Sequence, residues 1–312
     1  MGPDDSYQGS TFKEVRDQVF SDPYTTLPMY VITLGTLFSG VSNLILQASR
    51  KRVADSSDLA PHFQKLIHPR GIALTGTWNI TEKSNYTGYF AEGSRALIVV
   101  RCSVLMYNSR QGQTRGFGFA GKLFPTMDPE KRVKTANFVT IDVLAGTKAR
   151  YFTDVALTNA PPLGFNFDLF RLFGVVTAGT GAFIRADLNP FARPIYPVAE
   201  LGLPPRAAVR SPKWMMVRAW PGSGQADRVD FRDELRVEHY ANKTLRFDIS
   251  VASKRLASGE RDWRRLGHID LTESVTSDSA DHRLVFQHPR LRKMSAGPDG
   301  ELGYQVPVAT GR

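Results

Sequence analysis

The spacing of apolar positions changes from helical to strand-like near residue 70 of this 312-residue chain. The stretch 27–48 carries no charge, and its apolar residues recur at helical spacing. The opposite stripe is polar and consists of Thr36, Ser39, Asn43 and Gln47. This pattern predicts an N-terminal amphipathic helix over 29–48 that follows a polar arm. It favours packing on the protein or on a partner subunit, as in a homo-oligomer, over lying on or crossing a membrane.

From residue 70 onward, many segments alternate with a period of two, which predicts strands. In the first, Ile72, Leu74, Trp78 and Ile80 alternate with smaller or polar residues, which indicates a half-buried strand. Residues 96–106 are an apolar run rich in Val and Ile, which indicates a strand buried on both faces. Further strands are predicted at 117–124, 137–143, 214–220, 235–240, 245–251, 266–271 and 282–287. Asn242-Lys243 is predicted as a turn between two of them.

About eight strands with few long helices predict an α+β protein built on a closed antiparallel β-barrel with flanking helices. Residues 1–52 form the expected arm and amphipathic helix, and 53–312 form the barrel domain. The aromatic, glycine-rich segment 165–185 is expected to hold helix and loop.

Composition narrows the function classes. The net charge is +10, but Lys and Arg are scattered and no nucleic-acid motif lies among them, so no nucleic-acid partner is predicted. The chain has a single cysteine, Cys102, which excludes an intramolecular disulfide. Because it lies in an apolar run, its side chain is predicted to be buried in the core. The first 23 residues are polar and mixed in charge and predict no secretory signal. A cytoplasmic protein is expected, with membrane association through 29–48 as the alternative.

Polar side chains at three places are candidates for chemistry. His68 precedes the first strand and has the residue type of a general acid or base. Arg101 and Ser103 lie two apart in an apolar strand and therefore share a face. Arg101 needs an anion there, either a ligand or a carboxylate elsewhere in the chain that forms a buried ion pair. Asn137 enters an apolar strand and needs hydrogen-bond partners, although a strand-end position also explains it.

These features follow one another in an order that resembles the catalase family, most closely its small, catalase-related haem-peroxidase members. The segments that carry the resemblance are His68-Pro69-Arg70-Gly71, Arg101-Cys102-Ser103, Arg115-Gly116-Phe117 leading to Lys122, and Asn137. The resemblance covers 58–290 and is most specific between 66 and 142.

The resemblance implies a catalase-like barrel that binds haem and acts on hydrogen peroxide or on organic or lipid hydroperoxides. It assigns His68 as the distal acid/base, with Ser103 orienting its ring. Asn137 would hydrogen-bond the bound peroxide, and Arg101 would hold a haem propionate.

The chain departs from the family at the iron ligand. That family uses a tyrosinate in an Arg-x-x-x-Tyr motif, whereas Gly300 stands four residues before Tyr304. Tyr304, His282 or His288 are the substitutes that remain. The alternative is a haem-free protein of the same fold that binds an apolar, lipid-like ligand or acts in an assembly.

Overall fold

The computed structural model describes residues 9–28, 58–59, 62, 70–86, 88–108, 113–133, 135–141, 212, 214–219, 230–252 and 254–286. Its seven strands are β1 (Gly71–Ile80), β2 (Arg95–Asn108), β3 (Gln113–Phe124), β4 (Ala136–Ile141), β5 (Trp214–Ala219), β6 (Leu245–Ala252) and β7 (Arg264–Val275). Its α-helices are α1 (Phe12–Phe20), α5 (Phe231–Glu234) and α6 (Asp278–His282), and short 3₁₀ turns lie at Gly88–Phe90, Val237–His239 and Ala241–Lys243. The predicted segments 29–48 and 165–185 lie outside these residues.

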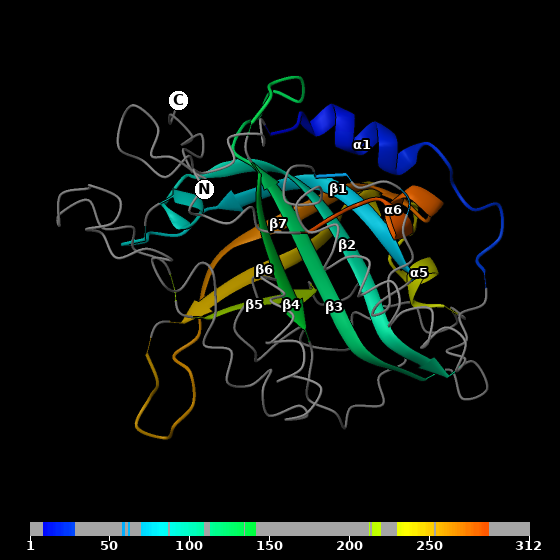
Figure 1. The fold of residues 1–312 in the computed structure, drawn as a ribbon. Coiled ribbons are helices and arrows are strands. Elements are labelled where there is room, and N and C mark those ends of the chain that lie inside the picture. The colour runs from blue at the N-terminus through cyan, green and yellow to red at the C-terminus, as the bar shows by residue number, and fades with distance from the viewer. Residues whose placement is uncertain are drawn as a thin grey trace, which may run out of the picture.

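The strands form one antiparallel sheet in the order β4-β3-β2-β1-β7-β6-β5 (Figure 1). Strand β1 is central, because it pairs with β2 on one side and with β7 on the other. The first of the seven strands is therefore joined directly to the last.

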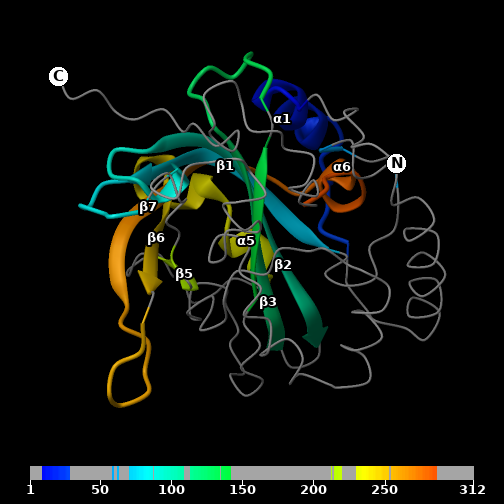
Figure 2. The same cartoon turned by 60° about the vertical axis from the view of Figure 1, so that its left-hand side comes forward.

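The sheet curls around its main core. One side of each strand supplies apolar residues to that core, among them Trp78, Val100 and Ile249, as a period of two requires. Phe119 of β3 meets Phe247 of β6 with ring centroids 5.1 Å apart, although three strands separate β3 from β6 in the sheet order. Figure 2 shows the curl, with β5 and β6 across from β2 and β3.

The prediction of a closed barrel of about eight strands is met in part. The described residues form a seven-stranded, curled half-barrel. Its edge strands β4 and β5 approach each other, but no hydrogen-bonded pairing between them is found within the part of the chain that the structure describes.

Helix α1 lies on the outer face of the sheet, against β2 and close to α6 (Figure 1). A capping box begins it, in which the Thr11 hydroxyl accepts from the Glu14 backbone N–H and the Glu14 carboxylate accepts from the Thr11 N–H. Its apolar side packs on the sheet in a second core, whose members include Phe12, Val15, Val19, Ala73, Val99 and Phe124. The segment predicted as a polar arm thus contains a helix that covers the sheet.

This outer cover changes the environment predicted for the first strand. Strand β1 is buried on both faces from Gly71 to Thr75, so the prediction of a half-buried strand is wrong for that part. In β2, burial of both faces is confirmed from Ile98 to Ser103. Cys102 is buried as predicted, and this burial raises the pKa of its thiol.

Two predicted strands are wrong. Residues 235–240 follow helix α5, whose first turn is capped by the Asp230 carboxylate, and continue as the 3₁₀ turn Val237–His239. In 282–287, His282 ends helix α6, and the described residues after it make only an isolated bridge, Leu284 to Leu59. Both segments have apolar spacing that a short buried turn satisfies as well as a strand does.

Within the described residues, no helix has both the length and the apolar character needed to cross a membrane. The membrane and subunit contacts predicted for 29–48 fall outside those residues and stay predictions.

Close backbone packing at Gly76 yields a test of the sheet. A Cβ at this position would lie 1.8 Å from the carbonyl oxygen of Asp270 on β7, at the point where the β1–β7 register shifts. We expect Gly76→Ala to lower the free energy of unfolding by about 1–3 kcal/mol, because the backbone must move to admit a methyl group. Urea denaturation measures this, with Ser250→Ala, at a half-buried position of β6, as the control. A Gly76→Ala protein as stable as wild type would contradict the β1–β7 packing.

Candidate functional site

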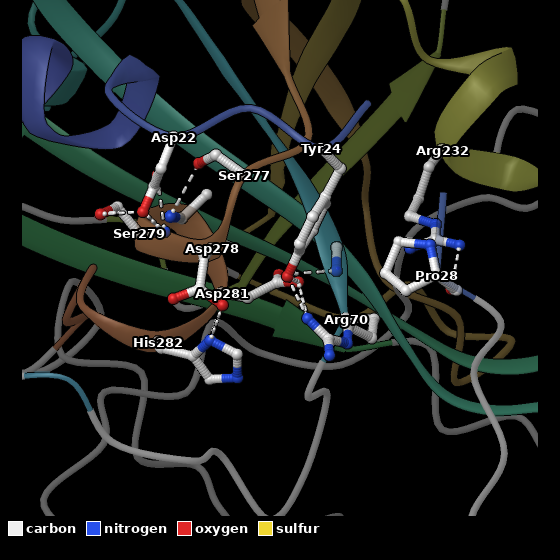
Figure 3. A network of polar contacts seen from close by, with 12 residues as sticks. Asp22, Tyr24, Pro28, Arg70, Arg232, Ser277, Asp278, Ser279, Asp281 and His282 are labelled. Atoms are coloured by element: carbon white, nitrogen blue, oxygen red, sulfur yellow. Dashed lines mark hydrogen bonds and ion pairs between the residues drawn. The ribbon is translucent and has the colours of Figure 1, made fainter. Parts of the chain in front are cut away.

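A buried carboxylate, Asp281 of α6, forms the centre of a polar cluster on the outer face of the sheet (Figure 3). Its Oδ1 accepts from Arg101 Nη2 at 2.7 Å and from the Gly71 backbone N–H at 2.9 Å. Its Oδ2 accepts from the Tyr24 hydroxyl at 3.2 Å and lies 3.4 Å from Arg70 Nη1. Arg70 also donates to the Tyr24 hydroxyl oxygen. We call these five residues the Asp281 cluster.

Helix α6 is fixed in place by polar contacts at its start (Figure 3). The Ser277 hydroxyl accepts from the Ala280 N–H at 3.0 Å and donates to a carbonyl of α1. The Asp22 carboxylate accepts from the Ser279 N–H at 3.0 Å. The N-terminal segment therefore holds the helix that carries Asp281 to the sheet.

The charges of the Asp281 cluster are unequally exposed. The side chain of Asp281 is 0% exposed and that of Arg101 is 5% exposed, whereas that of Arg70 is 27% exposed. Burial raises the pKa of Tyr24, and the nearby Asp281 carboxylate adds to the increase, so the phenol stays protonated and donates. Arg101 thus has the buried carboxylate partner that its place in an apolar strand requires.

A second buried cluster lies on the same face and contains Lys122, Asp58, Thr135 and Asn137. Lys122 is fully buried, and its Nζ donates to Asp58 Oδ1 at 2.5 Å and to Asn137 Oδ1 at 2.8 Å. The Thr135 hydroxyl donates to the same Asp58 oxygen at 2.6 Å. Burial alone would raise the pKa of Asp58, but the ammonium and the hydroxyl outweigh it and hold this pKa below its usual value.

The structure brings the predicted site residues together only in part. In the antiparallel register, Ser103 lies opposite Gly71 on one side and Gly118 on the other, and Asn137 lies opposite Lys122. Ser103 and Asn137 therefore share the outer face, two strands apart and offset by four register steps, or about 13 Å along the strands. His68, His288 and Tyr304 lie outside the described residues, so the roles assigned to them stay predictions.

His282, another candidate iron ligand, is engaged by its own helix. Its Nδ1 lies 2.8 Å from Asp278 Oδ1, and its ring lies near that of His62. Burial lowers the pKa of His282, and the carboxylates of Asp278 and Asp281 oppose that change.

Sequence reasoning missed several members of these clusters. Lys122 carried a usable signal, because a lysine inside an apolar strand requires an anionic partner just as Arg101 does. Asp281 carried none, since its partner in β2 is 180 residues away.

Comparisons with known proteins give only a distant likeness. No protein-family model matches the chain, and no curated protein matches it. Among solved structures, the fold is similar to a bacterial catalase with TM-score 0.36 and 13% identity, over 93% of this chain and 66% of that one. A fungal catalase gives TM-score 0.34 and 13% identity, over 91% of this chain and 66% of that one. The chain thus spans slightly less than two thirds of each catalase, and a likeness at this level assigns no activity.

Removal of the central carboxylate is expected to destabilise the protein strongly. In Asp281→Ala, the buried Arg101 loses its anion, and we expect the free energy of unfolding to fall by about 3–5 kcal/mol. Urea denaturation is the measurement, and Glu92→Ala, at an exposed carboxylate, should change stability by less than about 0.5 kcal/mol. A loss in Asp281→Ala no larger than that of the control would show that the cluster is not buried as described.

The second cluster is expected to make stability depend on pH. The pKa of Asp58 is lower in the folded protein than its ordinary value of 3.8. Ionised Asp58 therefore stabilises the folded protein fully when the pH is above 3.8. This stabilisation is lost as the pH falls through the lower pKa that Asp58 has in the folded protein. The stability difference between wild type and Asp58→Asn should be largest near neutral pH and shrink as the pH falls below 3.8. Urea denaturation at each pH tests this, and a difference independent of pH would count against it.

Proposed function

We propose that the chain is a catalase-related haem protein that acts on hydrogen peroxide or an organic hydroperoxide, with His68 as its acid/base. The observation that carries the proposal is the β1–β2 register, which sets Gly71 opposite Ser103. His68 precedes Gly71 by three residues, so chain connectivity keeps their Cα atoms within about 11 Å. This supports the predicted pairing of His68 with the Ser103 hydroxyl.

The groups proposed to bind a haem propionate are the guanidinium groups of Arg70 and Arg101 in the Asp281 cluster. Arg101, which the resemblance assigns to a propionate, already binds the Asp281 carboxylate. Arg70 is the more exposed of the two cations, and it is therefore better able to reach a carboxylate at the edge of the cluster. In this proposal Arg70 holds one propionate, and Arg101 supports it from the buried side of the Asp281 cluster.

In the proposed mechanism, the His68 imidazole accepts a proton from one oxygen of the bound peroxide and returns it to the departing oxygen. Ser103 orients the imidazole by a hydrogen bond. Haem, when bound, supplies the redox chemistry. Asn137 is left out of this version, because the strand register sets it about 13 Å along the strands from Ser103, in the other cluster.

The test is a visible spectrum and a peroxide assay on protein made with haem supplied. We expect a Soret band in wild type and in His68→Ala, with peroxide turnover reduced by about 100-fold or more in the variant. His239→Ala, in the 3₁₀ turn Val237–His239, is the matched control and should retain full turnover.

A protein that stays colourless after haem reconstitution would contradict the proposal and favour the second candidate. That candidate is a haem-free barrel that binds a lipid-like ligand or acts in an assembly. The observation in its favour is that the side chains of Arg101 and Asn137 both make buried contacts within the chain. Stoichiometric haem in the native protein would exclude it.

A further inference from the structure

A third group of side chains brings two imidazoles to one carboxylate at the edge of α6. His62 Nε2 lies 2.9 Å from Asp278 Oδ2, and His282 Nδ1 lies 2.8 Å from Asp278 Oδ1. The two imidazole centroids are 4.5 Å apart. One potential ligand atom from each of the three residues lies within 4.8 Å of the other two.

Two features of the fold produce this arrangement. Asp278 and His282 are four residues apart on α6, so both project from the same side of the helix. An antiparallel bridge joins Leu59 to Leu284, and the Val285 N–H donates to the Asp58 carbonyl at 3.1 Å. This pairing brings the chain near residue 59 beside the end of α6, and His62 follows three residues later.

The donor set is that of a transition-metal site. Imidazole nitrogens suit Zn²⁺, Fe²⁺ and Ni²⁺, whereas Mg²⁺ and Ca²⁺ prefer oxygen ligands. Neighbouring ligand atoms in a tetrahedral zinc site lie about 3.3 Å apart, so the observed separations require only a small movement of the side chains. The His282 side chain is 9% exposed, while those of Asp278 and His62 are 40% and 61% exposed, which gives an ion access from solvent.

We propose that His62, Asp278 and His282 bind one divalent transition-metal ion of the Zn²⁺ class, with the remaining coordination position taken by water or another ligand. The site does not depend on haem or on the proposed acid/base role of His68. A bound ion would join His62 to α6, the helix that also carries Asp281. Because only the folded chain assembles the three donors, binding stabilises the fold.

The experiment is equilibrium dialysis of the untagged, full-length protein against ZnCl₂, with MgCl₂ in parallel. We expect one Zn²⁺ per chain at saturation and no Mg²⁺ binding at the same concentration. His62→Ala, at an exposed position, should weaken Zn²⁺ binding by at least about 10-fold, the lower end of the loss seen when a group that only supports a ligand is removed. His239→Ala, a histidine elsewhere on the fold, should bind as wild type does.

Thermal unfolding supplies a second readout. Zn²⁺ should raise the Tm of wild type and of His239→Ala and leave that of His62→Ala unchanged. The proposal is overturned if wild type shows no saturable binding at one ion per chain, or if His62→Ala binds Zn²⁺ as tightly as wild type. Either result would leave the three residues as a hydrogen-bonded group only.

The outcome is separable from that of the proposed function. A colourless protein that binds Zn²⁺ at this site would defeat the haem proposal alone. A protein that carries haem but fails the dialysis would defeat the metal proposal alone.

Discussion

The buried Asp281 carboxylate is the contact on which the rest of the described structure depends. It receives a guanidinium from β2, a backbone N–H from β1 and a hydroxyl from the N-terminal segment. A carboxylate with no exposed surface is tolerated only with such partners. This requirement fixes α6 against the sheet, and the Asp22 and Ser277 contacts then fix the N-terminal segment against α6.

The outer face of β2, β3 and β4 carries four of the polar residues that the sequence analysis compared with catalases. Arg101, Ser103, Lys122 and Asn137 all lie on that face. In the structure these four residues fall into two separate places on that face. Ser103 and Arg101 pair with Gly71 and Ala73 at the start of β1, whereas Asn137 is held by Lys122 in the other cluster.

Periodicity predicted most of the sheet because each strand satisfies it locally. All seven strands overlap predicted ones. Asn242-Lys243 does form a turn, with positive φ at both residues, but it follows the 3₁₀ turn Val237–His239 instead of a strand. Helix α1 was missed although Phe12, Val15 and Val19 follow helical spacing behind the Thr11 cap, because the composition of the segment is mostly polar. The ion pair of Arg101 was one of two stated interpretations, but no local pattern could identify Asp281 as the partner.

The pairing of β1 with β7 determines when the sheet can be completed during synthesis. Residues 73–80 cannot complete their ladder until residues 267–275 have been synthesised. Until then a nascent chain lacks the β7 partner of β1, and contacts this distant in sequence form slowly. Strand β1, the first of the seven in sequence, thus gains its second neighbour only when β7, the last of them, has been made.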